Sequence, residues 1–182
     1  QQLYEGIDLG RKGPVGLITY MRTDSTRISA LAQQEARGFV EQEFGAAYIP
    51  EKPNVYAAGK KAQDAHEAIR PTSTEMAPDE VEKFLSKDQF KLYRLIWQRF
   101  VASQMTPAVY DTLSVAIQAG SRYLCKASGS QLKFAGFTAV YAGVEGKKEK
   151  DVLLPELGAG DALELNKTLP QQHFTEPPPR YN

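Results

Sequence analysis

The hydrophobic pattern of the chain changes period at Pro107, and this change limits the possible folds more than any other feature. Before it, apolar residues recur every three or four positions, as they do on one face of a helix. After it, residues 112–118 alternate between apolar and polar or small side chains, as in a half-buried strand. We therefore expect an α+β protein with two parts: a helical domain over residues 1–105 and an antiparallel β-rich domain over residues 106–182.

The first helix of the helical part is expected between a cluster of capping residues and a glycine. Asp24, Ser25 and Thr26 are all favourable N-cap residues, and apolar residues at helical spacing follow them. Gly45 is the expected end of this helix, because glycine adopts the backbone conformations that terminate helices at little cost.

Two more helices are expected before the change of period. A short one over residues 63–69 ends at Pro71, since proline disfavours a helical conformation in the residue before it. A longer one starts at Pro78, where proline and the acids after it suit a helix N-terminus. It runs to about Met105, with a break near Ser86.

The second part of the chain is expected to contain a hairpin and several short strands. The glycine and serine at positions 120–121 form a turn signal, and residues 123–127 would return as the second strand. Three further short strands are expected at residues 152–154, 162–165 and 172–175.

Composition excludes several classes of protein. The single Cys125 cannot form an internal disulfide, which favours a reducing, cytoplasmic location. With only two histidines and this one cysteine, a zinc site is not expected. The 22 basic residues are balanced by 22 acidic ones, which argues against a domain that binds nucleic acid through net charge alone.

A dense polar cluster at residues 19–26 follows an apolar run. Its simpler interpretation is a turn that caps the next helix, because polar residues are common in that position. The functional alternative places Tyr20 at a helix N-terminus beside Arg22. There the guanidinium and backbone N–H groups would bind a phosphate.

A second cluster lies at residues 64–72 and contains His66 and Arg70. If this segment is helical, the two side chains are four positions apart on one face. An ordinary surface helix with charge pairs is one interpretation, and a hydrogen-bonding face that contacts a phosphate is the other. Neither cluster alone decides between them.

Taken together, four segments resemble the type IA DNA topoisomerases, the bacterial topoisomerase I group. The first holds the sequence Gly-Leu-Ile-Thr-Tyr-Met-Arg-Thr-Asp-Ser, and the second holds Asp-Ala-His-Glu-Ala-Ile-Arg-Pro-Thr. All four follow the family's order and extend over most of the chain: residues 16–25, 64–72, 92–105 and 172–181.

The resemblance implies a nucleophilic phosphoryl transfer. The family's tyrosine, matched by Tyr20, attacks single-stranded DNA and forms a 5′-phosphotyrosine link, which relaxes negative supercoils without ATP. Arg22 matches an arginine that stabilises phosphate charge, and His66 matches a histidine that hydrogen-bonds the phosphate or shuttles a proton. Arg22, Asp24, Ser25 and Arg70 are the implied DNA-binding residues. For the last three, capping or scaffold roles are equally open.

The resemblance also implies a magnesium site that this sequence lacks. In the family a separate Toprim domain binds Mg²⁺ through an Asp-x-Asp motif, and no Asp-x-Asp occurs here. We therefore expect an internal piece of the enzyme, inactive without the remaining domains of the polypeptide. This piece would consist of a winged-helix-like tyrosine domain and part of the β-rich arch. We expect it to have no metal site and no contact with a membrane. The alternative is a non-catalytic DNA-binding or interaction module, in which Tyr20 has no chemical role.

Overall fold

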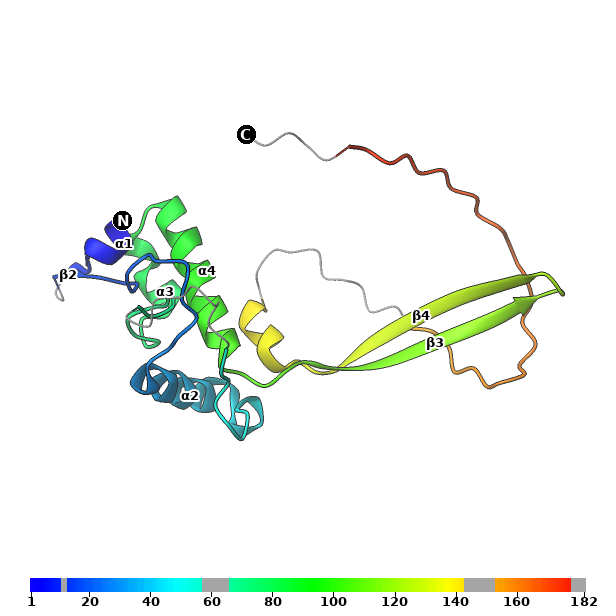
Figure 1. Cartoon of the computed structure of the whole chain (residues 1–182), viewed down its shortest axis with the longest axis horizontal. Coiled ribbons are helices and arrows are strands. Elements are labelled where there is room, and N and C mark those ends of the chain that lie inside the picture. Colours follow the sequence, from blue (N-terminus) through cyan, green and yellow to red (C-terminus); the bar gives the residue numbers. More distant parts are fainter. Residues whose placement is uncertain (11–12, 57–65, 143–152, 178–182) are drawn as a thin grey trace.

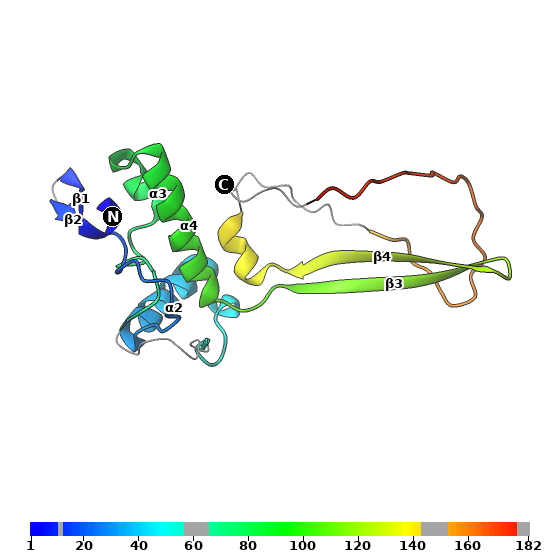
Figure 2. The ribbon, with the colours of Figure 1, turned by 45° about the horizontal axis from the view of Figure 1, so that its top comes forward.

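The computed structural model of the chain describes residues 1–10, 13–56, 66–142 and 153–177. A group of helices lies at one end, and a long two-stranded hairpin projects from it (Figure 1). In both views the segment 153–177 crosses the hairpin near its tip and then turns back toward the helical end (Figure 2). Helices combined with antiparallel strand pairs confirm the α+β class expected from the sequence.

The described elements follow one another in a simple order. The α-helices are α1 (Gln2–Glu5), α2 (Ala30–Phe44), α3 (Pro78–Val81) and α4 (Lys87–Ser103). Three short 3₁₀ helices are η2 (Ala46–Tyr48), η3 (Glu82–Phe84) and η4 (Gly136–Tyr141). The strands form two antiparallel pairs, β1 (Ile7–Asp8) with β2 (Pro14–Val15) and β3 (Val109–Ala119) with β4 (Tyr123–Phe134).

Helix α2 ends where the sequence predicts but begins later. Gly45 is its C-terminal cap, as expected. Its N-cap is Ser29, whose Oγ accepts a hydrogen bond from the backbone N–H of Ala32, so the predicted cap at residues 24–26 is wrong. The physical reason is that the chain before Ser29 is tied to another segment, since the Ala68 N–H donates to the Arg27 carbonyl.

The predicted short helix over residues 63–69 is wrong in its described portion. Residues 63–65 lie outside the described residues, and residues 66–70 are not helical. Their backbone groups bond instead to residues 16–27, which removes the helical hydrogen bonds a short segment would need.

The prediction for the third helical stretch is confirmed, including its break. Helix α3 starts at Pro78, and α4 starts after Ser86, which forms a capping box with Gln89. Helix α4 carries much of the core, with Tyr93, Trp97 and other apolar side chains buried. The Tyr93 hydroxyl donates to the Met76 carbonyl at 2.6 Å, and burial, aided by the charge of Glu80, raises the pKa of Tyr93.

The core lies within the helical part and its immediate attachments. It is formed by buried residues from α1, the chain around residue 17, the helices and η4: Leu3, Leu9, Leu17, Ile18, Ala32, Ala36, Val40, Val81, Tyr93, Trp97, Phe100, Val101, Met105 and Val140. Segments far apart in sequence therefore share one hydrophobic core. No helix among the described residues is long and apolar enough to cross a membrane.

The hairpin is confirmed and is longer than predicted. Strands β3 and β4 pair from Ala119 and Tyr123 at the tip to Val109 and Phe134 at the base. The three further short strands are wrong, because residues 153–177 contain no strand and residue 152 lies outside the described part. Alternating apolar residues favour a strand only where a neighbouring strand takes up their backbone groups.

Candidate active site

The two polar clusters of the sequence lie side by side in the structure, in their described portions. The Thr19 N–H donates to the Arg70 carbonyl at 2.9 Å, and the Thr72 N–H donates to the Leu17 carbonyl at 3.0 Å. Ile18 and Pro71 form an antiparallel bridge between these two bonds. The site is therefore built on a short backbone pairing, which fixes the segment before Tyr20 against the segment after His66.

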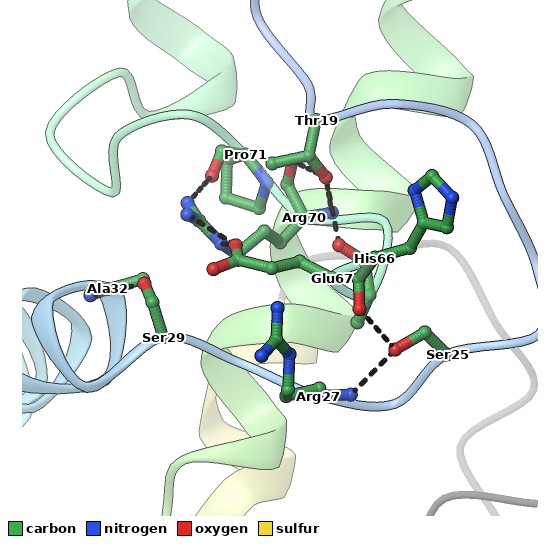
Figure 3. Close-up of polar contacts among 10 residues, drawn as sticks. Thr19, Ser25, Arg27, Ser29, Ala32, His66, Glu67, Arg70 and Pro71 are labelled. Atoms are coloured by element: carbon green, nitrogen blue, oxygen red, sulfur yellow. Dashed lines mark hydrogen bonds and ion pairs between the residues drawn. The ribbon is translucent and has the colours of Figure 1, made fainter. Parts of the chain in front are cut away.

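Two hydroxyl groups reinforce this pairing (Figure 3). The Thr19 hydroxyl donates to the Ala68 carbonyl at 2.8 Å and accepts from the Arg70 N–H at 3.0 Å. The Ser25 hydroxyl, which is buried, donates to the His66 carbonyl at 2.7 Å and accepts from the Arg27 N–H at 3.2 Å. Ser25 thus positions the backbone of His66, and its role at DNA stays a prediction.

Tyr20 is half exposed and is contacted by two other rings. The exposed fraction of the residue is 52%. The ring centroid of Tyr4 lies 5.5 Å from that of Tyr20 at an interplanar angle of 70°, an edge-to-face contact. The ring of His66 lies 6.0 Å away with a tilt of 31°. Tyr20 does not lie at a helix N-terminus as predicted, because α2 begins only at Ala30.

Arg22 joins the carboxylate of Asp24 to the ring of His66. Its Nε lies 2.9 Å from both Asp24 carboxylate oxygens, and its Nη1 lies 3.4 Å from His66 Nε2. Because a guanidinium only donates, a hydrogen bond in this contact requires His66 Nε2 to be the acceptor. The Arg22 and Asp24 side chains are 39% and 36% exposed, and a ligand can reach them from solvent.

Arg70 is not brought to the same face as His66. The Arg70 Nη2 pairs with Glu67 Oε2 at 2.8 Å, and its Nη1 donates to the Pro71 carbonyl at 2.9 Å. The two side chains point in opposite directions in Figure 3. The predicted shared helical face is therefore wrong, since residues 66–70 are not helical. A DNA contact by Arg70 stays a prediction.

Two residues near the site carry no motif signal and were missed by sequence reasoning. One is Tyr4. The other is Glu35 on α2, which accepts hydrogen bonds from the Ser73 hydroxyl at 2.6 Å and from the Thr74 N–H at 2.8 Å. Burial acts to raise the pKa of Glu35, but these hydrogen bonds and the charge of Arg70 outweigh it and lower the pKa. Glu35 thereby holds the chain after Pro71 against α2.

Comparison with known proteins identifies the family of this chain. The family model described as DNA topoisomerase matches residues 1–182. The chain belongs to the DNA topoisomerase family. The match confirms the resemblance expected from the four sequence segments, of which 64–72 and 172–181 extend beyond the described residues.

A solved topoisomerase shares the fold. The chain is similar to full-length topoisomerase I from Thermotoga maritima, with 38% sequence identity and a TM-score of 0.72. The likeness covers 88% of this chain and 24% of that protein, so the chain spans about a quarter of the length of the solved topoisomerase.

The described residues of this topoisomerase chain do not fit a magnesium site. They contain no group of three or more histidine, cysteine, aspartate or glutamate side chains that could hold a metal ion. Asp24, the carboxylate paired with Arg22, is already engaged by a cation. The acids at 41, 43, 79, 80 and 82 are exposed on helices α2 and α3 and the 3₁₀ turn η3.

Proposed function

We propose that this chain is the part of a type IA DNA topoisomerase that presents the attacking tyrosine. Tyr20 would cleave one strand of negatively supercoiled DNA, hold it as a 5′-phosphotyrosine while supercoils relax, and then reseal it. The observation that carries the proposal is a half-exposed Tyr20 contacted by His66, with Arg22 bound to the same histidine. The family match and the likeness to a solved topoisomerase support it.

The proposed reaction exchanges one phosphate ester for another. The Tyr20 phenol oxygen forms a bond to phosphorus, and the bond from phosphorus to the 3′ oxygen of the upstream nucleotide breaks. The phenol loses a proton and the released 3′ oxygen gains one, so charge is conserved. Because the phosphodiester is regained when that 3′ hydroxyl attacks in reverse, no nucleotide cofactor is consumed.

Arg22 is the proposed electrostatic stabiliser of this exchange. Its Nε is held by Asp24, which orients the guanidinium without burying it. A phosphate beside Tyr20 would take up charge-assisted hydrogen bonds from the same guanidinium. Such preorganised charge stabilises the negative charge that builds up on the transferring phosphoryl group.

His66 is the proposed proton carrier. Its Nε2 lies 3.4 Å from Arg22 Nη1, so a phosphate bound by Arg22 would lie next to the imidazole. On this proposal the imidazole accepts the phenol proton during cleavage and passes it to the released 3′ oxygen, and the same transfers run in reverse during resealing. The Ser25 hydroxyl donates to the His66 carbonyl at 2.7 Å and so holds the backbone from which the ring projects.

The rest of the enzyme is proposed to lie on other domains of the same polypeptide. The fraction of the solved topoisomerase that this chain covers, 24%, leaves room for them. Magnesium would be held there rather than by the described residues, and no step above is routed through it. On this proposal the isolated chain does not cleave DNA, and the full-length protein acts on single-stranded segments of duplex in the cytoplasm, at the nucleoid.

The proposal is tested in the full-length protein with a single-stranded oligonucleotide labelled at its 3′ end. A covalent adduct that survives denaturation is expected, and Tyr20→Phe should abolish it. Tyr123→Phe is the matched control, because Tyr123 is 69% exposed at the tip of the hairpin. The isolated chain should form no adduct with the same oligonucleotide.

Two results would contradict the proposal in different ways. An adduct that persists in Tyr20→Phe would exclude Tyr20 as the nucleophile. DNA binding without any adduct, weakened by Arg22→Ala and unchanged by Tyr20→Phe, would favour the non-catalytic DNA-binding module instead.

A further inference from the structure

We propose that Tyr4 is a positioning residue for Tyr20: its ring, fixed by the docking of α1 on the chain before Tyr20, holds the attacking phenol in place. The inference rests on the proposed role of Tyr20 as nucleophile. It adds a residue outside both polar clusters, from an element of only four residues.

The first support is the way in which α1 is attached. The Leu3 carbonyl accepts hydrogen bonds from the Leu17 N–H at 2.7 Å and the Ile18 N–H at 3.2 Å. All three side chains are buried in the core, at 3%, 0% and 4% exposure. A helix this short has little stability of its own, so its position is set by this docking. The backbone next to Tyr4 is therefore tied directly to the backbone two residues before Tyr20.

The second support is a close approach that only glycine permits. A Cβ placed on Gly16 would lie 2.6 Å from the Tyr4 carbonyl oxygen. Any side chain at this position would have to push the backbone of Tyr4 away. The absence of a side chain at Gly16 thus brings Tyr4 against the segment that leads to Tyr20.

The consequence is a restraint on the Tyr20 side chain, which is otherwise half exposed to solvent. Tyr20 is 52% exposed, and Tyr4 itself is 42% exposed. The edge-to-face contact at 5.5 Å and 70° is a favoured geometry for aromatic pairs. Together with the His66 ring at 6.0 Å, it limits rotation of the Tyr20 ring. Since orientation of a nucleophile contributes directly to rate, loss of the Tyr4 ring should slow attack without weakening DNA binding.

The test compares cleavage rate with DNA affinity in the full-length protein. The single-turnover cleavage rate is measured with the 3′-labelled oligonucleotide, and the Kd of the same oligonucleotide is measured by fluorescence anisotropy. Tyr4→Leu should lower the rate about 3- to 10-fold and leave Kd within about twofold. Tyr4→Phe should restore the wild-type rate, because it keeps the ring and loses only the hydroxyl.

A pair of glycine variants tests the docking separately. Gly16→Ala should lower the cleavage rate at least as much as Tyr4→Leu, since it displaces α1. Gly38→Ala is the matched control, because a Cβ on Gly38 in α2 meets nothing within 4 Å. Combining Gly16→Ala with Tyr4→Leu should give less than the product of the two single losses, because both act through the same ring.

The outcomes separate the inference from the function on which it rests. A wild-type cleavage rate in Tyr4→Leu overturns the inference, as does a rise in Kd that matches the rate loss or a Tyr4→Phe protein as slow as Tyr4→Leu. In each case an inactive Tyr20→Phe leaves the proposed function standing. Cleavage by Tyr20→Phe overturns the proposed function itself.

Discussion

The helical part and the β3–β4 hairpin are built on opposite principles. The helical part, with η4 packed on it, buries a continuous set of apolar side chains around Tyr93 and Trp97. In β3 and β4 no residue is buried. A two-stranded hairpin is only marginally stable by itself in water, so its order depends on the base to which it is attached. The proposed chemistry lies on the packed part, where side chains can be held in fixed positions.

The attachment between the two regions is tight. The Thr106 N–H donates to the Tyr48 carbonyl, and the Phe137 N–H donates to the Thr106 carbonyl, both at 2.9 Å. Gln98 on α4 donates to the Val140 carbonyl at 3.1 Å. Both ends of the hairpin are thus hydrogen-bonded to the helical part. The two regions therefore differ in how far their side chains are buried, although they are firmly connected.

The largest expected effect comes from emptying the core beneath the site. Trp97 is 7% exposed, packs edge-on against Phe39 and donates to the Thr74 carbonyl at 3.1 Å. Trp97→Ala should lower the free energy of unfolding by about 3–5 kcal/mol, through lost burial and a cavity. Urea denaturation measures it, and Leu31→Ala at a 77% exposed position of α2 is the control. A loss below about 1 kcal/mol would contradict a shared core.

The next effect tests the junction. Gly136 has φ 48°, and a Cβ there would lie 2.3 Å from the Pro107 carbonyl oxygen. Gly120 at the hairpin tip has φ 61°, but its Cβ would meet nothing within 4 Å. In both alanine variants the left-handed backbone conformation should lower the free energy of unfolding by about 1–2 kcal/mol. Urea denaturation should show a larger loss of unfolding free energy for Gly136→Ala, because the added Cβ also pushes apart the two ends of the hairpin. Equal losses would show that the junction adapts.

A smaller effect depends on pH and concerns Glu35. Its pKa is lower in the folded chain than the ordinary 4.5. The folded state therefore binds fewer protons than the unfolded state in that region, so the stabilisation is present above pH 4.5 and is lost as pH falls through the folded pKa. At pH 7 the wild-type protein should unfold at a higher midpoint urea concentration than Glu35→Gln. The difference between the two midpoints should shrink toward pH 3. Glu43→Gln, exposed on the same helix, is the control. A difference that does not change with pH would contradict this account.

The smallest effect is expected for an exposed apolar side chain on the hairpin. Leu124 on β4 is 60% exposed. Leu124→Ala should change the free energy of unfolding by no more than about 0.5 kcal/mol, because little apolar surface is recovered from water there. Thermal unfolding of the chain is sufficient to measure it. A loss comparable to that of Trp97→Ala would mean that the hairpin contributes to the core.

Features determined by neighbouring residues could be predicted from the sequence. The alternating residues after Pro107 indicated the hairpin, and Gly45 and Ser86 marked the correct end of α2 and start of α4. The longer helix and the hairpin succeed because the hydrogen bonds that form them lie within the helix or between adjacent strands.

Features determined by distant contacts could not. The pairing of Thr19 with Arg70 keeps residues 66–70 out of a helix. The hydrogen bond from the Ala68 N–H to the Arg27 carbonyl holds the chain before Ser29, so α2 begins only at Ala30. Arg70 turns to Glu67 rather than to the face of His66, which a helical spacing rule cannot show. Tyr4 and Glu35 reach the site only through the fold. Tyr20, Arg22 and His66 were identified by the resemblance, and their roles remain the proposal to be tested.

The most direct measurement locates the covalent link. The full-length protein is trapped with a single-stranded oligonucleotide, digested with protease and nuclease, and analysed by tandem mass spectrometry. We predict a nucleotide joined through its 5′ phosphate to the peptide that contains Tyr20, with the fragment ions placing it on that residue. A link to another residue, or attachment through a 3′ phosphate, would contradict it.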